Sequence, residues 1–368
     1  MRRKRSVIGA FLTLAVTLAA LSGGTDIIKE GSAVSASVAA RDVQVSSRLW
    51  ELLFGGDGAS DATAVEHSEL MLIPGGGVFG ARVQRAHPSV DDPGALGELA
   101  SGDVIISANK KEIHAGMELS EVVRSSGGAP ILLHIERGGR ALDLSVTPKE
   151  CDGVYSLGVT LRDTAAGIGT ITYIDPSDGS FGGLGHGICD SETRKPTAIT
   201  GGRVTGALLG GIQKGEAGKP GELSGILTDR TLGEVYLNTS SGVFGKLEDY
   251  KTTAEALPVG KSSDVHAGEA TIISTVKNGK TMEYSVKIFD IDRGGDGTKC
   301  FKVKVTDPTL IALTGGIVKG MSGSPIIQDG KLVGAVTHVM VADPTEGYGI
   351  FIENMLSASR AEVQPKAA

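Results

Sequence analysis

From residue 151 to about residue 356 the chain is built from short segments in which apolar and polar positions alternate or run apolar. A period of two is typical of β-strands with one buried face, and a short apolar run is typical of a strand buried on both faces. These segments are residues 154–161, 167–173, 202–209, 224–227, 270–276, 282–291, 300–305 and 324–341. Glycine-rich turns separate them, so the pattern predicts a mostly β region.

Residues 69–150 have a different order of elements and predict a small separate domain. A glycine-rich loop and an alternating strand at 72–83 precede an apolar strand pattern at 102–109. Residues 117–124 then have a helical pattern, and residues 131–137 form a closing strand. This order resembles a PDZ domain, which binds a peptide along a strand edge.

The first 25 residues predict a signal peptide or signal anchor. Basic residues at positions 2–5 precede fifteen uncharged residues from Val7 to Leu21, and small and polar residues follow. Fifteen helical residues span roughly 22 Å, less than the ~30 Å hydrocarbon core, so cleavage is favoured by length. We expect an exported chain with a linker at 26–68 and a tail at 359–368.

Composition narrows the class of protein. The 368 residues leave room for two domains after the leader, and the 54 glycines with only 4% aromatic residues favour strands and tight turns. The formal net charge of −7, with no basic cluster after residue 5, argues against a nucleic-acid partner. Three cysteines follow no metal-ligand spacing, so the sequence indicates neither a metal nor a cofactor.

The segment from Gly320 to Pro325 (G-M-S-G-S-P) predicts a nucleophilic serine. Small neighbours leave room for a substrate carbonyl beside the Ser322 hydroxyl, and backbone amides of Gly320 and Ser322 can form an oxyanion hole. Glycine at 320 and 323 also tolerates unusual backbone angles. The alternative is an ordinary turn before the apolar strand that starts at Ile326.

His186 is the candidate general base. It lies between two glycines, which have no side chains to obstruct the approach of a substrate. His338 lies in an apolar strand pattern and is interpreted as a structural histidine. Cys189, three residues after His186, is interpreted as a small buried packing residue.

The motifs at Gly182–Ile188, Gly320–Ile327, Gly334–Val339, Asp343–Thr345 and Gly347–Ile350 resemble the stage IV sporulation protein B peptidase family. The resemblance extends from about residue 70 to about residue 356. It implies a PDZ domain at 69–150 followed by a chymotrypsin-like double β-barrel peptidase domain at 151–358.

The resemblance also implies a function. Members are exported serine endopeptidases of late sporulation signalling that act in the space between the two forespore membranes. They cleave their own N-terminal segment and the extracytoplasmic part of a regulatory membrane protein, which leads to activation of a late sigma factor. Two other functions remain open: a PDZ-bearing adaptor without catalysis, and a degradative quality-control protease.

Two further site assignments follow. The loop residues Gly76, Gly77, Val78, Phe79 and Gly80 are expected to receive a peptide in the PDZ domain, with a plain hairpin loop as the alternative. Asp307, fifteen residues before Ser322, is the predicted acid of the catalytic triad, an assignment that the resemblance supports. Its rivals are Asp290, Asp292 and Asp296, in a loop that reads as a solvated turn.

Overall fold

The computed structural model describes residues 70–360 apart from 96, 249, 251, 278, 295 and 296. The expected leader, the linker, residues 361–368 of the tail and the rival aspartate Asp296 lie outside the described residues. Among the helices of the described part, none is both long enough and apolar enough to cross a membrane.

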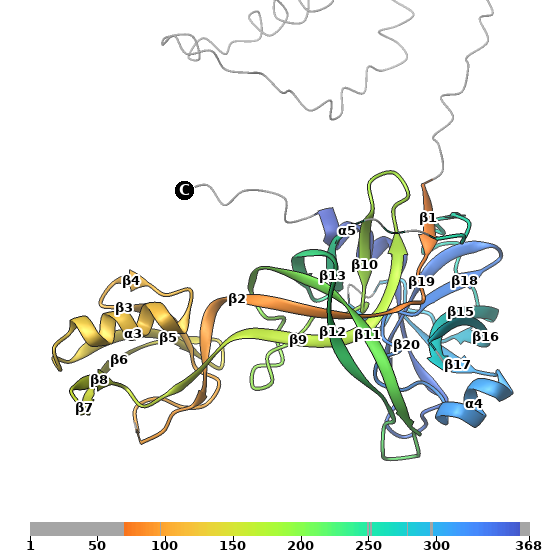
Figure 1. The fold of residues 1–368 in the computed structure, drawn as a ribbon. Helices are drawn as coiled ribbons and strands as arrows, with labels where there is room; N and C mark the ends of the chain where they lie inside the picture. Colours follow the sequence, from red (N-terminus) through yellow and green to blue (C-terminus); the bar gives the residue numbers. More distant parts are fainter. Residues whose placement is uncertain are drawn as a thin grey trace, which may run out of the picture. The chain divides into compact units, whose positions relative to one another are not determined.

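Six strands form a first barrel, because their pairings return to the strand on which they start (Figure 1). In order of pairing they are β2 (Val78–Asp92), β9 (Thr160–Ile174), β10 (Ser180–Gly183), β13 (Gly242–Leu247), β12 (Glu222–Thr239) and β11 (Ile199–Gln213), which pairs again with β2. The short strand β1 (Met71–Pro74) pairs with β9, and β14 (Leu257–Pro258) pairs with β1. Phe79 and Phe181 pack edge to face in the core with ring centroids 5.6 Å apart.

The second barrel is closed by six strands from the C-terminal half of the chain. In order of pairing they are β15 (Gly268–Lys277), β16 (Lys280–Phe289), β17 (Phe301–Val305), β20 (Glu346–Phe351), β19 (Lys331–Val339) and β18 (Pro325–Gln328). Helix α4 (Pro308–Thr314) follows β17, and α5 (Ile352–Arg360) packs against β19 and β20. The mostly β, double-barrel fold expected from the sequence is thus confirmed.

A small module lies between β2 and β9 in the chain and has its own core of residues such as Ile105, Leu119 and Leu133. Its elements are β3 (Val104–Ala108), β4 (Lys111–Glu112), α3 (Gly116–Ser125), β5 (Ile131–Arg137), β6 (Arg140–Val146), β7 (Lys149–Cys151) and β8 (Val154–Ser156). The helix expected at 117–124 and the strand expected at 131–137 match α3 and β5.

The module is an insertion in the first barrel, and this differs from the expected boundaries at residues 69 and 150. Residues 78–84 of β2 pair within the barrel, whereas Ser89 of the same strand pairs with Val104 of the module. Strand β9 likewise begins beside the module and ends in the barrel (Figure 1). The local pattern ended the first strand at residue 83 and gave separate segments at 154–161 and 167–173, so it did not reveal that β2 and β9 each continue from the first barrel into the module.

Candidate active site and peptide groove

The turn from Gly320 to Ser324 presents the Ser322 side chain ahead of β18. Gly320 and Gly323 have φ of +99° and +94°, which glycine adopts at little cost. A Cβ atom on Gly323 would lie 2.1 Å from the carbonyl oxygen of Thr170, so no other residue fits there without a shift. Ser322 itself is half-buried, so its hydroxyl keeps access to a substrate.

Strand β9 of the first barrel holds this turn of the second barrel through three hydrogen bonds. The amide of Thr170 donates to the carbonyl of Ser322 at 2.9 Å, and its hydroxyl donates to the carbonyl of Gly320 at 2.9 Å. The hydroxyl of Thr172 donates to the carbonyl of Gly323 at 2.8 Å. Both threonines are fully buried, so these bonds are shielded from water.

The turn that carries His186 leaves β10 through two residues with left-handed backbone angles, Leu184 at φ +67° and Gly185 at φ +62°. Leu184 is buried and is not a glycine, so its left-handed backbone angles indicate a strained turn. Its amide donates to the carbonyl of Thr170 at 3.1 Å. Thr170 therefore contacts both the serine turn and the histidine turn.

Asn238 on β12 fixes the segment that follows His186. Its amide nitrogen donates to the carbonyls of Ile188 and Thr197 at 2.9 Å, and its oxygen accepts from the amide of Ile188 at 2.8 Å. Asn238 was not singled out by the sequence analysis. Buried and exposed side chains alternate along β12, and Asn238 falls on the exposed side of this alternation. The local pattern therefore does not distinguish Asn238 from a solvent-facing residue.

The serine and histidine turns meet at the end of β19. The Ser322 hydroxyl donates to the carbonyl of Thr337 at 2.7 Å. The next residue, His338, places its ring 5.1 Å from that of His186, measured between centroids. No hydrogen bond joins Ser322 to His186 among the described residues.

A pocket of about 500 Å³ borders the histidine side, lined by His186, His338, Leu184 and Cys189 among others. Cys189 is exposed rather than buried as expected, and His338 is an exposed member of this pocket rather than a core histidine. A second pocket of about 560 Å³ borders Gly320. Residues 166–168 of β9 line both pockets.

Both histidines of the site have a pKa below that of a free imidazole. Burial lowers the pKa of His186, and the hydrogen bond between Nδ1 and the Gly187 carbonyl at 3.0 Å only partly opposes this. Desolvation by the surrounding protein atoms lowers the pKa of His338 to about 4, although part of this side chain is exposed, and repulsion from His186 and Lys299 adds to the effect. Because the carbonyl of Gly187 only accepts, Nδ1 carries the proton and the Nε2 lone pair is available as a base.

The backbone amides of Gly320 and Ser322 remain available for an oxyanion. The neighbouring amides of Met321 and Gly323 donate to the carbonyls of Val318 and Val336 at 3.1 Å and 2.7 Å. Among the described residues, no carbonyl or side chain accepts from the amides of Gly320 and Ser322. Two unpaired donors beside the nucleophile are what an oxyanion hole needs.

The predicted acid Asp307 is not paired with His186 in this structure. Its carboxylate caps helix α4 by accepting from the amide of Leu310 at 2.9 Å. Its rivals also have other partners: Asp290 pairs with Lys302, and Asp292 accepts from the amide of Gly294. In the described part of the chain, the hydrogen-bond acceptor of the His186 ring is a carbonyl and not a carboxylate.

The assignment of Gly76 to Gly80 to a PDZ peptide site was wrong. The amide of Gly76 donates to the carbonyl of Ile171, and Val78, Phe79 and Gly80 pair with β9, with Phe79 and Gly80 also paired to β11. Phe79 is fully buried in the first barrel. Strands occupy both edges of the backbone at Phe79 and Gly80, so no peptide can add there as a further strand.

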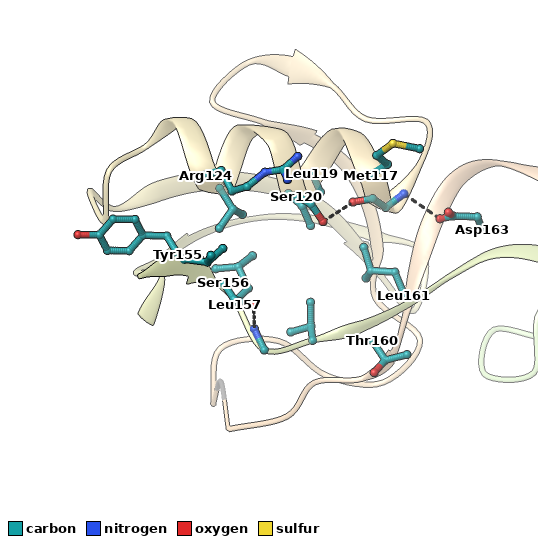
Figure 2. A pocket seen from close by; sticks show the side chains of 15 residues that line it. Met117, Leu119, Ser120, Arg124, Tyr155, Ser156, Leu157, Thr160, Leu161 and Asp163 are labelled. Atoms are coloured by element: carbon teal, nitrogen blue, oxygen red, sulfur yellow. Dashed lines mark hydrogen bonds between the residues drawn. The ribbon is translucent and has the colours of Figure 1, made fainter. Parts of the chain in front are cut away.

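The groove of the small module lies instead between α3 and residues 154–161, with a volume of about 500 Å³ (Figure 2). Leu119 and Val123 from the helix, with Leu157 and Leu161 opposite, give it an apolar lining. Gly158 has φ of +66°, and a Cβ there would meet nothing within 4 Å. The apolar-Gly-apolar run at 157–159 was the sequence signal that could have located this groove.

Comparison with solved structures finds the Rv3671c protease of M. tuberculosis in its active form, with 12% identity and a TM-score of 0.33 over 55% of this chain and 76% of that chain. The HtrA-type protease AlgW with a decapeptide gives 12% identity and a TM-score of 0.30 over 54% and 52%. These likenesses are too low to bear on function.

Among curated proteins, "Putative zinc metalloprotease all3971" of Nostoc sp. is 31% identical over 86 residues. This match spans 22% of the present chain and 24% of that protein, so it leaves most of both chains unmatched.

The family described as SpoIVB peptidase S55 matches residues 153–356. This range is more than half of the chain, and it contains both glycine-flanked turns and the two pockets beside them. The chain therefore belongs to the SpoIVB peptidase S55 family.

Proposed function

We propose that the chain is an exported serine endopeptidase of sporulation signalling with Ser322 as nucleophile and His186 as general base. The observation that carries this proposal is the packing of the two glycine-flanked turns on one residue, Thr170, and on the end of β19. Family membership supports the setting in sporulation.

The proposed mechanism uses these two side chains and the unpaired amides beside Ser322. On substrate binding the Ser322 hydroxyl leaves the Thr337 carbonyl and turns to Nε2 of His186. His186 takes the hydroxyl proton as Ser322 attacks the scissile carbonyl, and it later gives that proton to the leaving amine. The amides of Gly320 and Ser322 bind the oxyanion that develops on the substrate.

The small module acts in this proposal as a PDZ domain. A peptide lies between α3 and residues 154–161, with an apolar side chain against Leu119 and Leu157. Support comes from the apolar lining and from the open backbone at Gly158. The peptide is either the chain's own N-terminal segment or part of a substrate.

The proposed substrates are the N-terminal segment of the chain itself and the extracytoplasmic part of a regulatory membrane protein. Cleavage of the latter between the two forespore membranes would release activation of a late sigma factor. This setting rests on the family and on the leader expected at 1–25. The residues in front of position 70 include the proposed site of self-processing.

Ser322→Ala is expected to abolish both self-processing and cleavage in trans while the chain stays folded, because alanine removes only the attacking oxygen. N-terminal truncation of the purified protein is followed by mass spectrometry, and the fold by circular dichroism. Ser324→Ala is the matched control, because this neighbouring serine is fully buried and its hydroxyl bonds Ser274. Full activity of Ser322→Ala would identify a different nucleophile and favour the adaptor function.

The acid limb of kcat/KM is expected below pH 6.5. The base must be neutral, and a lowered pKa keeps His186 neutral to a lower pH than a free imidazole, so activity is lost only as pH falls through that lowered value. His186→Ala should remove activity, whereas His338→Gln should keep it within about threefold at pH 7, because His338 is neutral there and does not carry the proton. The assignment of the base fails if His338→Gln is inactive or if the acid limb lies above pH 6.5.

Thr170→Val is expected to lower kcat/KM by about 10-fold, since loss of the hydroxyl leaves the half-buried Gly320 carbonyl without its donor, at a cost near the lower end of about 1–3 kcal/mol. Thr164→Val is the matched control, because Thr164 lies exposed on the same strand. Steady-state kinetics on a peptide substrate compares the two variants. Equal activity of both would show that the hydroxyl of Thr170 does not position the turn.

The family resemblance still predicts Asp307 as the acid of the triad. The Asp307→Ser variant separates this role from the observed role of Asp307 as the N-cap of α4. Serine is also a good N-cap residue, so stability should change little. Serine carries no charge to stabilise a protonated His186, so the acid assignment predicts a loss of about 10⁴ in kcat. Thermal unfolding and kcat are measured together. Retained activity in a stable Asp307→Ser variant would show that Asp307 caps α4 and is not the acid of the triad.

A further inference from the structure

Three side chains converge where β2 leaves the first barrel and enters the small module. His87 lies on β2, Glu112 ends β4, and His114 lies two residues before α3. One ligand atom of each, an imidazole nitrogen or a carboxylate oxygen, lies within 4.8 Å of the other two. The sequence analysis found no metal site here, because 25 residues separate His87 from Glu112.

The two histidines are held by reciprocal hydrogen bonds to the backbone. Nδ1 of His87 donates to the carbonyl of Ile113 at 2.8 Å, and Nδ1 of His114 donates to the carbonyl of Ala86 at 3.0 Å. Each ring thus bonds the residue that precedes the other histidine. The rings are stacked with centroids 5.3 Å apart and planes 21° from parallel.

These bonds leave both Nε2 atoms free and facing the same carboxylate. A carbonyl oxygen only accepts, so the proton sits on each Nδ1 and each Nε2 carries a lone pair. Metal-binding histidines in proteins are oriented in this way by a backbone carbonyl or carboxylate on the second nitrogen. The backbone of β2 and of the turn at 113–114 supplies that support before any ion binds.

Glu112 completes the set of donor atoms. Its Oε1 lies 3.9 Å from Nε2 of His87, and its Oε2 lies 3.9 Å from Nε2 of His114. These separations are too long for hydrogen bonds, but they are close to the ~3.4 Å between ligand atoms around a tetrahedral zinc ion with bonds of about 2.1 Å. The carboxylate therefore stands where an ion would fill the space between it and both rings.

We propose that His87, Glu112 and His114 bind one divalent transition-metal ion, Zn²⁺ being the best match to two imidazoles and a carboxylate. The site is open to solvent on the side of Glu112, which is largely exposed, so water completes the coordination. The other charged groups nearby have their own partners: Lys111 pairs with Glu121, and Glu118 accepts from the amide of His114.

The ion would connect β2, β4 and the start of α3. His87 belongs to a strand that continues into the first barrel, and Glu112 belongs to β4 of the module. His114 lies just before α3, which forms one wall of the groove. Bound Zn²⁺ would therefore fix the start of that wall to β2.

Isothermal titration of the full chain, prepared without a histidine tag, with ZnCl₂ tests the proposal. One equivalent is expected to bind, and His87→Ala and His114→Ala should each weaken binding at least about 100-fold, since even loss of a supporting contact costs 10–100-fold. His134→Ala is the matched control: this histidine of the same module pairs with Asp143 at 2.7 Å but belongs to no cluster of three such ligands among the residues that the structure describes. The control should bind as the wild type does.

Nitrogen-15 spectra of the histidine rings give a readout on the wild type that does not depend on how the variants fold. Both rings should keep Nδ1 protonated, and the Nε2 resonances of His87 and His114 should shift on addition of one equivalent of ZnCl₂. Absence of binding, unshifted Nε2 resonances at saturation, or an equal loss in His134→Ala would each overturn the proposal.

Discussion

The catalytic centre depends on the hydrogen bonds of one buried residue, Thr170 of β9. Its amide and hydroxyl bond the carbonyls of Ser322 and Gly320, and its own carbonyl accepts from Leu184 at the start of the histidine turn. The backbone of the serine turn approaches so closely that a Cβ on Gly323 would lie 2.1 Å from that carbonyl. One peptide unit of the first barrel thus sets the position of groups from both barrels, and the absence of side chains at the glycines permits it.

The same strand connects the two functional regions. Strand β9 begins at Thr160 and Leu161, which line the groove of the small module, and reaches the serine turn ten residues later at Thr170. Strand β2 pairs with β9 at residues 78–84 and again at Ser89, Val90 and Asp92, with register shifts between Gln84 and Ser89 and between Val90 and Asp92. Because the module is inserted between these strands, β9 connects its groove directly to the turn of Ser322, covalently along the strand and through the hydrogen bonds of Thr170.

Each of the three side chains predicted to form the triad bonds a group outside that triad in this structure. The Ser322 hydroxyl bonds a backbone carbonyl, the Nδ1 of His186 bonds the carbonyl of its own neighbour, and Asp307 caps a helix. Met321, between Gly320 and Ser322, is fully buried in the core of the second barrel. The turn is therefore held by apolar burial as well as by its hydrogen bonds with Thr170.

The sequence alone determined what depends on local pattern. Alternation of apolar residues predicted most strands of the two barrels but not β10, β13 or β20, and glycines around Ser322 and His186 marked the two turns, because these signals come from neighbours in the chain. Tertiary structure alone showed that β2 and β9 each run from the first barrel into the small module, and that the groove of this module is lined by residues 154–161 and not by residues 76–80. It also revealed Thr170, Asn238 and the cluster of His87, Glu112 and His114. Their roles come from partners far away in the chain, and a long-range contact leaves no trace in the local pattern of apolar and polar positions.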